Sequence, residues 1–131
     1  MKILVVDDNP DAAELLKLVL QPYGDVDTAT EGLQALDKIR QAWEQGQPFE
    51  LILLDVLMPK MDGLEALSVL RREERSRGIA DAQRTKVIMI TAYADEENMQ
   101  RALSIGCEGY VFKTAGKNKI LDRLRVLGLI E

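Results

Sequence analysis

Short apolar runs alternate along the chain with longer stretches in which apolar residues recur every three or four positions. The short runs have the length and the β-branched content of strands, and they cover residues 2–6, 26–29, 51–55, 86–91 and 109–112. The longer stretches have the period of amphipathic helices, and they cover residues 11–21, 31–45, 63–77, 95–105 and 117–127. The pattern therefore predicts a strand followed by a helix, five times over.

Two of the predicted strands are apolar at every central position, from Leu51 to Leu54 and from Val87 to Ile90. Such runs are typical of parallel strands that are covered by helices on both faces. Strict alternation of strands and helices also implies right-handed crossovers between parallel strands. We therefore expect an α/β protein in which a five-stranded parallel sheet forms the middle of a three-layer sandwich.

Capping signals and spacing predict how the helices begin and which faces they bury. Asn9 and Pro10 are suited to the N-cap and the first position of the first helix. Its apolar face is predicted to contain Ala12, Leu15, Leu16, Val19 and Leu20. The corresponding face of the second helix contains Leu33, Leu36, Ile39 and Trp43. The charged residues 71–84 predict the end of a helix followed by a long solvated loop.

Composition narrows the classes of protein. The chain has 131 residues, the size of one domain, and we expect residues 1–131 to form it. A formal net charge of -5 argues against direct binding to nucleic acid or to an anionic membrane. The apolar run after Lys2 is too short for a signal peptide. The lone Cys107 cannot form an internal disulfide, so a cytoplasmic location is expected.

Side chains that can bind a metal ion or take part in a reaction follow or end four of the five predicted strands. Asp7 and Asp8 follow the first, Asp55 ends the third, Thr91 ends the fourth and Lys113 follows the fifth. Sites in open parallel sheets form at the carboxyl ends of the strands. We therefore expect these five side chains to lie together at one edge of the sheet.

The residue types at this edge suit phosphoryl chemistry. Carboxylates are the hard oxygen ligands that Mg²⁺ prefers, and an aspartate can act as a nucleophile that forms an aspartyl phosphate. A hydroxyl from Thr91 and an ammonium group from Lys113 can neutralise and hold phosphoryl oxygens. The chain contains no histidine, so it cannot itself be a phosphohistidine donor. Phosphoryl transfer would therefore make it an acceptor.

Five stretches of the sequence match one known family. They are Ile3 to Pro10, Leu51 to Pro59, Met61 to Gly63, Ile90 to Ala92 and Gly106 to Lys113. On these motifs the chain resembles the receiver domain of bacterial two-component response regulators, most of all the stand-alone CheY-like kind, over essentially its whole length. The resemblance implies a flavodoxin-like (βα)5 fold with strand order 2-1-3-4-5.

The resemblance also implies a role for each matching site residue. Asp55 would be the carboxylate that takes a phosphoryl group from a histidine kinase or a histidine phosphotransfer protein. Asp8, Asp55 and the backbone carbonyl of Leu57 would ligate Mg²⁺ directly, and Asp7 would act through water. Lys113 would pair with the phosphoryl group.

On activation, the family pattern implies that Thr91 moves toward the phosphoryl group and that Tyr110 swings inward behind it. The output face for a downstream protein would then be the helix from Asp95, the strand through Tyr110 and the last helix. A monomer is expected, with no direct contact to nucleic acid or membrane.

The chain departs from the family pattern after its lysine, where Thr114 replaces the usual proline. A cis bond without proline costs about 3–4 kcal/mol, so a trans bond is expected here. The last helix also begins with Lys117 and Lys119, where the helix dipole favours acids. From Lys113 to Arg125 there are five basic residues and one acid. This positive patch suggests docking to an acidic partner surface, with Lys117 and Lys119 in contact.

Two further positions bear on the lifetime of a phosphorylated form. In this family, the residue two after the phosphorylated aspartate and the residue two after the switch threonine flank the path of hydrolytic water. Here they are Leu57 and Tyr93, which can screen an acyl phosphate and cannot orient water well. We expect a phosphorylated state that lasts minutes or more.

Other functions remain open from sequence. An aspartate-nucleophile phosphohydrolase would need a second aspartate where Leu57 stands, and a flavin-binding domain would need hydroxyls where Asp7 and Asp8 stand. The chain could also be a receiver fold that docks partners without phosphate, or a receiver excised from a larger regulator or hybrid kinase. The main expectation is a signalling phosphoacceptor, not an enzyme, that catalyses only its own phosphorylation and dephosphorylation.

Overall fold

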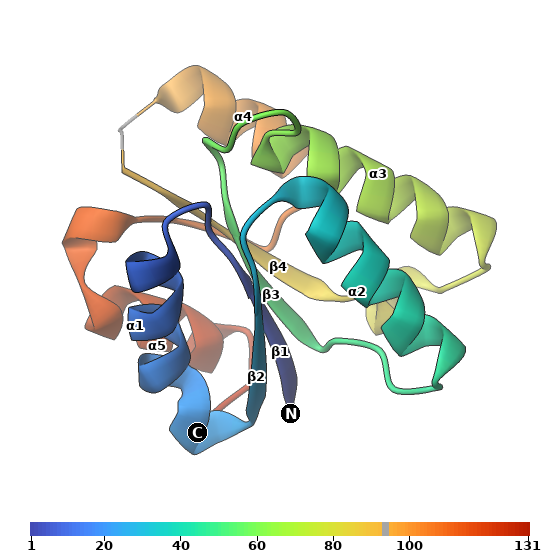
Figure 1. Ribbon diagram of the computed structural model, residues 1–131, viewed down its shortest axis with the longest axis horizontal. Helices are drawn as coiled ribbons and strands as arrows, with labels where there is room; N and C mark the ends of the chain where they lie inside the picture. Colours follow the sequence, from blue (N-terminus) through green and yellow to red (C-terminus); the bar gives the residue numbers. More distant parts are fainter. Residues whose placement is uncertain (93–94) are drawn as a thin grey trace.

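The computed structural model describes residues 1–92 and 95–131. The strands are β1 (Lys2–Val6), β2 (Asp25–Ala29), β3 (Leu51–Asp55), β4 (Lys86–Thr91) and β5 (Gly109–Phe112). The helices are α1 (Pro10–Leu20), α2 (Gly32–Glu44), α3 (Gly63–Ser76), α4 (Glu96–Ile105) and α5 (Lys117–Val126). Strand and helix alternate throughout, as the hydrophobic pattern predicts (Figure 1).

All strand pairs are parallel, and the strand order is β2-β1-β3-β4-β5. This is the order that the family resemblance implies. The register aligns the carboxyl ends of the strands: Val6 pairs with Leu54, Asp55 with Ile90 and Thr91 with Phe112. The ends of β1, β3, β4 and β5 therefore lie level with one another.

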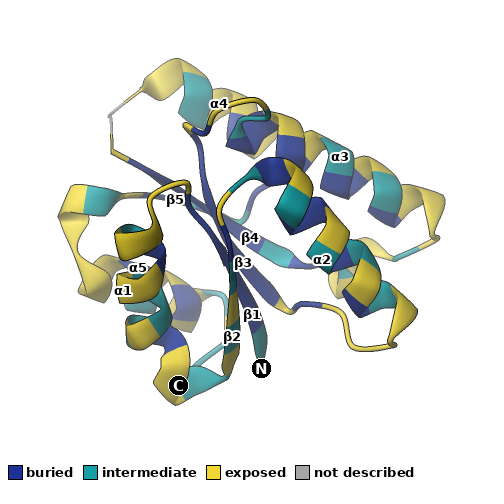
Figure 2. Cartoon of the chain, viewed as in Figure 1, coloured by how far each residue is buried: buried dark blue, intermediate teal, exposed yellow. Residues whose placement is uncertain are grey.

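The sheet is buried on both faces because alternate side chains of each strand point to opposite layers. Ile3, Val5, Leu51, Leu53, Ile88 and Ile90 pack with residues of α1 and α5. Leu4, Val6, Ile52, Leu54, Val87 and Met89 pack with residues of α2, α3 and α4. In Figure 2 the central strands β1, β3 and β4 are almost entirely buried, whereas β2 at the edge of the sheet and the outer faces of the helices are largely exposed.

The predicted caps of α1 are confirmed, whereas two members of the predicted apolar faces are wrong. The side chain of Asn9 accepts hydrogen bonds from the backbone N–H groups of Asp11 and Ala12, and Pro10 opens the helix. Leu15 of α1 is 63% exposed and Leu33 of α2 is 52% exposed. Each lies on the edge of an apolar stripe that is wider than the part of the helix that meets the sheet.

Residues 71–84 are only partly the solvated segment that the charge pattern predicts. Residues 80–83 are exposed, and three of them, Asp81–Gln83, form a short 3-10 turn. Arg71 and Glu74, however, are 2% and 3% exposed, so they belong to the interior of the protein. For these two residues the expectation of a solvated surface is wrong, because both lie on the buried face of α3.

Within residues 1–92 and 95–131, no helix is both long and apolar enough to cross a membrane.

Candidate functional site

The carboxylates of Asp7, Asp8 and Asp55 meet at the carboxyl ends of the strands, as their sequence positions predict. One carboxylate oxygen from each lies within 4.8 Å of the other two. Asp7 and Asp55 are buried, whereas Asp8 is exposed. The register explains this convergence, since β1 and β3 are adjacent and end at the same level.

Local backbone contacts hold the two buried carboxylates in place. The N–H of Asp7 donates to the carbonyl of Ala29 at 3.0 Å, and the Asp7 side chain accepts from the N–H of Asn9 at 3.0 Å. The N–H of Leu57 donates to Oδ1 of Asp55 at 3.3 Å. This amide already points at the carboxylate, and it is placed to cradle an anion there.

The β3–α3 loop is packed closely against the strand that carries Asp55. Gly63 donates its N–H to the carbonyl of Val56 at 2.9 Å, and a Cβ at Gly63 would overlap the carbonyl of Asp55. Lys60 in this loop adopts a left-handed φ of 68°. The return of the chain to α3 therefore requires glycine at position 63.

Lys113 supplies the positive charge of the site. Its Nζ lies 2.9 Å from Oδ2 of Asp7 and 3.2 Å from Oδ2 of Asp55. The described residues contain no cis peptide bond, so the expected trans bond before Thr114 is confirmed. A 3-10 turn, Lys113–Ala115, and Gly116 at φ 83° carry the chain into α5. The lysine therefore reaches both aspartates with Thr114, and not proline, as the next residue.

Burial and charge perturb the titration of the central pair. Burial and then the charge of Asp7 raise the pKa of Asp55 to about 6, against the lowering influence of Lys113. Burial lowers the pKa of Lys113, but the two aspartates outweigh burial and raise it. One ammonium group therefore compensates a buried pair of carboxylates only in part.

The donor set fits a hard divalent cation. Oδ2 of Asp7 is buried, and its contact with Lys113 does not have hydrogen-bond geometry. An oxygen in this state, beside a second buried carboxylate and an exposed third one, can still accept a metal ion. Oxygen-only ligands with open access suit Mg²⁺ better than a thiol- or imidazole-preferring metal.

Thr91 and Tyr110 lie behind the site, on neighbouring strands. Thr91 is buried at the end of β4, and the Tyr110 hydroxyl is buried as well. Burial raises the pKa of the Tyr110 phenol, and the nearby Thr91 side chain lowers it by a smaller amount. The phenol makes no hydrogen bond of good geometry within the described part of the chain. Tyr110 thus occupies an inward position, with its ring edge-on to Phe112 at 6.1 Å between centroids.

The two residues predicted to screen the phosphoryl group are Leu57, which the structure describes, and Tyr93, which it does not. Leu57 is 49% exposed and sits two residues after Asp55. Tyr93 lies outside the described residues, so its predicted screening role stays a prediction.

Sequence reasoning missed a second cluster of charged residues, far from this edge. Arg71, Glu74 and Glu108 form a buried ion network at the opposite end of the sheet. A signal was present: Arg71 and Glu74 continue the spacing of Leu64 and Leu67 along the buried stripe of α3. A charge at a core position of an amphipathic helix predicts a buried partner.

Comparison with known proteins identifies the family. Residues 3–125 match the response regulator receiver domain. The chain therefore belongs to the receiver family of two-component systems, and its fold is CheY-like.

Among relatives, the osmosensing histidine protein kinase SLN1 of Saccharomyces cerevisiae is 31% identical over 92% of this chain, which covers 9% of that protein. Chemotaxis protein CheY of Treponema pallidum is 30% identical over 94% of this chain and 79% of its own length. Two response regulators of similar identity are covered over only 55% and 49% of their length.

A solved structure of a receiver domain is similar to this chain in fold. The receiver domain of the histidine kinase CKI1 from Arabidopsis thaliana, complexed with Mg²⁺, has a TM-score of 0.82 and 28% identity, with 96% of this chain and 90% of that chain covered.

Proposed function

We propose that this chain is a phosphoacceptor that takes a phosphoryl group onto Asp55 from a phosphohistidine of a histidine kinase or a histidine phosphotransfer protein. The observation that carries the proposal is the position of Lys113, whose ammonium group contacts both buried carboxylates. A nucleophile, a counter-charge and a set of metal ligands thus converge in a family whose members are receivers. The chain acts on itself and is not an enzyme with a separate substrate.

The transfer is a displacement at phosphorus. A carboxylate oxygen of Asp55 forms the new bond to phosphorus as the bond from phosphorus to the donor's imidazole nitrogen breaks, and the bonding pair stays on that nitrogen. The reaction requires the ionised carboxylate, and the ammonium group of Lys113 favours that form. Once the phosphoryl group is in place, the same ammonium group can shift from the Asp55 carboxylate to a phosphoryl oxygen.

Mg²⁺ would be held by Asp7, Asp8, Asp55 and the backbone carbonyl of Leu57. When bound, it neutralises charge on the phosphoryl oxygens and lowers the repulsion between the carboxylates and the donor. The N–H of Leu57, which already donates to Asp55, is in position to donate to a phosphoryl oxygen. Placement and charge neutralisation account for most of the catalysis in such transfers.

Thr91 and Tyr110 form the switch in this proposal. The Thr91 hydroxyl can donate a hydrogen bond to the phosphoryl group from the end of β4, next to the residue that pairs with Asp55. A shift of Thr91 toward Asp55 would leave space beside the Tyr110 ring, which is already turned inward, and would favour that inward position over an outward one. The phosphoryl group would thereby stabilise one arrangement of α4, β5 and α5 over another.

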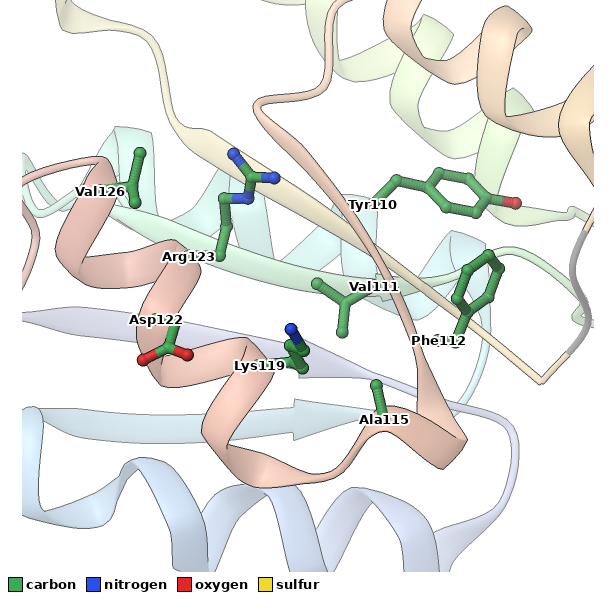
Figure 3. Close-up of a pocket in the computed structure, with 8 residues that line it drawn as sticks. All are labelled: Tyr110, Val111, Phe112, Ala115, Lys119, Asp122, Arg123 and Val126. Carbon is green, nitrogen blue, oxygen red and sulfur yellow. The ribbon is translucent and has the colours of Figure 1, made fainter.

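The proposed output face contains a groove of about 340 Å³ between β5 and α5 (Figure 3). Phe112, Ala115 and Val126 supply apolar walls, and Lys119 and Arg123 supply positive charge. The Tyr110 ring points away from α5 in this view. A downstream protein with an acidic, partly apolar surface would fit this groove.

The structure separates the two lysines that the sequence groups together. Lys119 lines the groove beside β5, whereas Lys117 lines a different groove, between α1 and α5. We therefore assign Lys119 and Arg123 to the proposed output contact. The protein acts as a cytoplasmic monomer, with no direct contact to nucleic acid or membrane.

Intact mass after incubation with acetyl phosphate tests the proposal. One phosphate adduct that forms with Mg²⁺ and is absent in EDTA supports it. A folded protein that takes up no phosphate under either condition contradicts it, and then favours a receiver fold that docks partners without phosphate.

A further inference from the structure

We propose that the buried network of Arg71, Glu74 and Glu108 fixes the C-terminal end of α4, so that the switch moves the N-terminal end of α4 about this fixed point. The inference rests on the proposed phosphoacceptor function. Arg71 would be a positioning residue, because it lies at the opposite end of the sheet from Asp55 and touches none of the reacting atoms.

Arg71 joins α3 to the turn between α4 and β5. Its Nε donates to the carbonyl of Gly106, the residue that caps α4, at 2.8 Å. Its Nη1 donates to Oε1 of Glu74 at 2.6 Å, and its Nη2 donates to Oε2 of Glu108 at 3.0 Å. The planar guanidinium thus uses all three of its nitrogens, in a geometry that lysine could not reproduce.

Both carboxylates of the network are also tied to the chain that leads into β4. Oε2 of Glu74 accepts from the N–H of Thr85 at 2.9 Å. Oε2 of Glu108 accepts from the N–H of Val87 at 2.7 Å, and its Oε1 accepts from Nε of Arg84 at 2.9 Å. Every carboxylate oxygen has a donor, and two arginines balance two glutamates.

Burial makes this connection rigid. The side chains of Arg71, Glu74 and Glu108 are 2%, 3% and 10% exposed. Withdrawing one member would leave an uncompensated charge in the interior, which is strongly unfavourable. The network therefore resists any motion that separates α3, the start of β4 and the turn after α4.

The other end of α4 is held much more loosely. Ala102 is the one residue of α4 that is buried in the described structure, and it stands in the second half of the helix. Asp95 caps the first turn through the N–H of Asn98, a contact within the helix itself. Glu96, Glu97 and Gln100 in the first half of the helix are exposed, and Asn98 and Met99 are only half-buried. Close packing does not fix this half of the helix.

The loose end is the end that the switch can reach. α4 begins at Glu96, five residues after Thr91, and its N-cap is Asp95, whereas its far end runs directly into Gly106 and Cys107. A displacement of Thr91 would therefore be transmitted to the first turns of α4. The network would convert that displacement into a rotation of α4 about residues 106–108.

Hydrogen exchange of the whole chain, with acetyl phosphate and Mg²⁺ or without, tests the pivot, and intact mass is measured in parallel. In the native protein, phosphorylation should change the exchange of residues 96–101 at least threefold and leave residues 105–109 unchanged. The variant Arg71→Met with Glu74→Gln and Glu108→Gln removes the three buried charges together. It leaves without its partner only Arg84, whose side chain is 28% exposed and can be hydrated. In this variant the change should spread to residues 105–109. Arg75→Met, an exposed change on the same helix, should behave like the native protein.

The outcomes separate the two levels of the account. If phosphate uptake is normal but the hydrogen exchange of residues 105–109 already changes in the native protein, the pivot alone is overturned. The same holds if phosphate uptake is normal and the triple variant keeps the native exchange pattern. Absence of phosphate uptake in the native protein overturns the phosphoacceptor function and the pivot with it.

Discussion

The ammonium group of Lys113 lies 3.2 Å from Oδ2 of Asp55, although the residue that follows it is Thr114 and not the proline of the family pattern. The contact joins the end of β3 to the chain just after β5, across the intervening strand β4. It shows that the 3-10 turn at Lys113–Ala115 and Gly116 can aim the lysine without a cis bond.

Replacing Lys113 with methionine should slow phosphorylation by acetyl phosphate at least tenfold, which corresponds to about 1.4 kcal/mol in the activation free energy. The cause is the loss of the one cation that contacts both Asp7 and Asp55 among the described residues. The rate is measured from the growth of the phosphate adduct. Lys117→Met, at an exposed site on α5, is the matched control, and equal rates in the two variants would argue against a role for Lys113.

The stability of the metal-free protein should depend on pH through Asp55. Its pKa rises from the ordinary 3.8 to about 6 in the folded state, so the folded protein binds this proton more tightly than the unfolded chain does. The stabilisation is complete below about pH 4 and is lost as pH rises to about 6, so the free energy of unfolding falls across that window. A shift of about two units sets an upper limit of about 3 kcal/mol.

Urea unfolding in EDTA at several pH values measures this dependence. Asp55→Asn should lose the slope between pH 4 and 6 and should be more stable than the native protein at pH 7. The exposed Asp81→Asn should keep the native slope. Native and Asp55→Asn curves that stay parallel across this range would show that Asp55 titrates normally. Added Mg²⁺ should restore stability at pH 7, because an ion that binds only the folded state stabilises it.

Replacing Leu57 with asparagine should shorten the life of the phosphorylated form, from minutes or more to at most about a tenth of the native value. Leu57 is 49% exposed beside the Asp55 carboxylate, and an amide in its place can orient an attacking water. Decay is followed by intact mass after the phosphodonor is removed. Leu33→Asn changes an equally exposed leucine on α2 and should leave the decay unaltered. An unchanged lifetime in Leu57→Asn would remove the screening role.

Replacing Gly63 with alanine should destabilise the protein by about 1–3 kcal/mol, the range expected when a clash forces a packed segment to move. The new Cβ would overlap the carbonyl of Asp55, so the phosphoacceptor itself would shift. Both the urea midpoint and the rate of phosphorylation should fall. Ser68→Ala, on the exposed face of the same helix, should change neither. A Gly63→Ala protein with native stability would mean that the loop can relax freely.

The sheet and most of the site were predictable because they follow from short-range rules. Alternating strands and helices impose parallel pairing, and parallel pairing brings the ends of β1, β3, β4 and β5 to one edge. Residues at those ends, such as Asp7 and Asp55, must then be neighbours. Their distances, and the contact of Lys113 with both, depend on side-chain conformation and became visible only in the structure.

Burial on the helices was less predictable, for a physical reason. Periodicity shows that a stripe is apolar but does not show which part of a wide stripe meets the sheet, and so Leu15 and Leu33 are exposed. Arg71 and Glu74 are the reverse case. Each appears solvated by its charge, yet partners from the Gly106 turn and from the start of β4 satisfy it in the interior. Those partners are distant in sequence, so local patterns could not supply them.

The most direct test of the central claim is intact mass of the native protein and of Asp55→Asn after incubation with acetyl phosphate and Mg²⁺. The account predicts one phosphate adduct on the native protein, its absence when Mg²⁺ is chelated, and none on folded Asp55→Asn. An adduct of equal amount on Asp55→Asn, or on the native protein without Mg²⁺, would contradict the assignment of Asp55 as a metal-assisted phosphoacceptor.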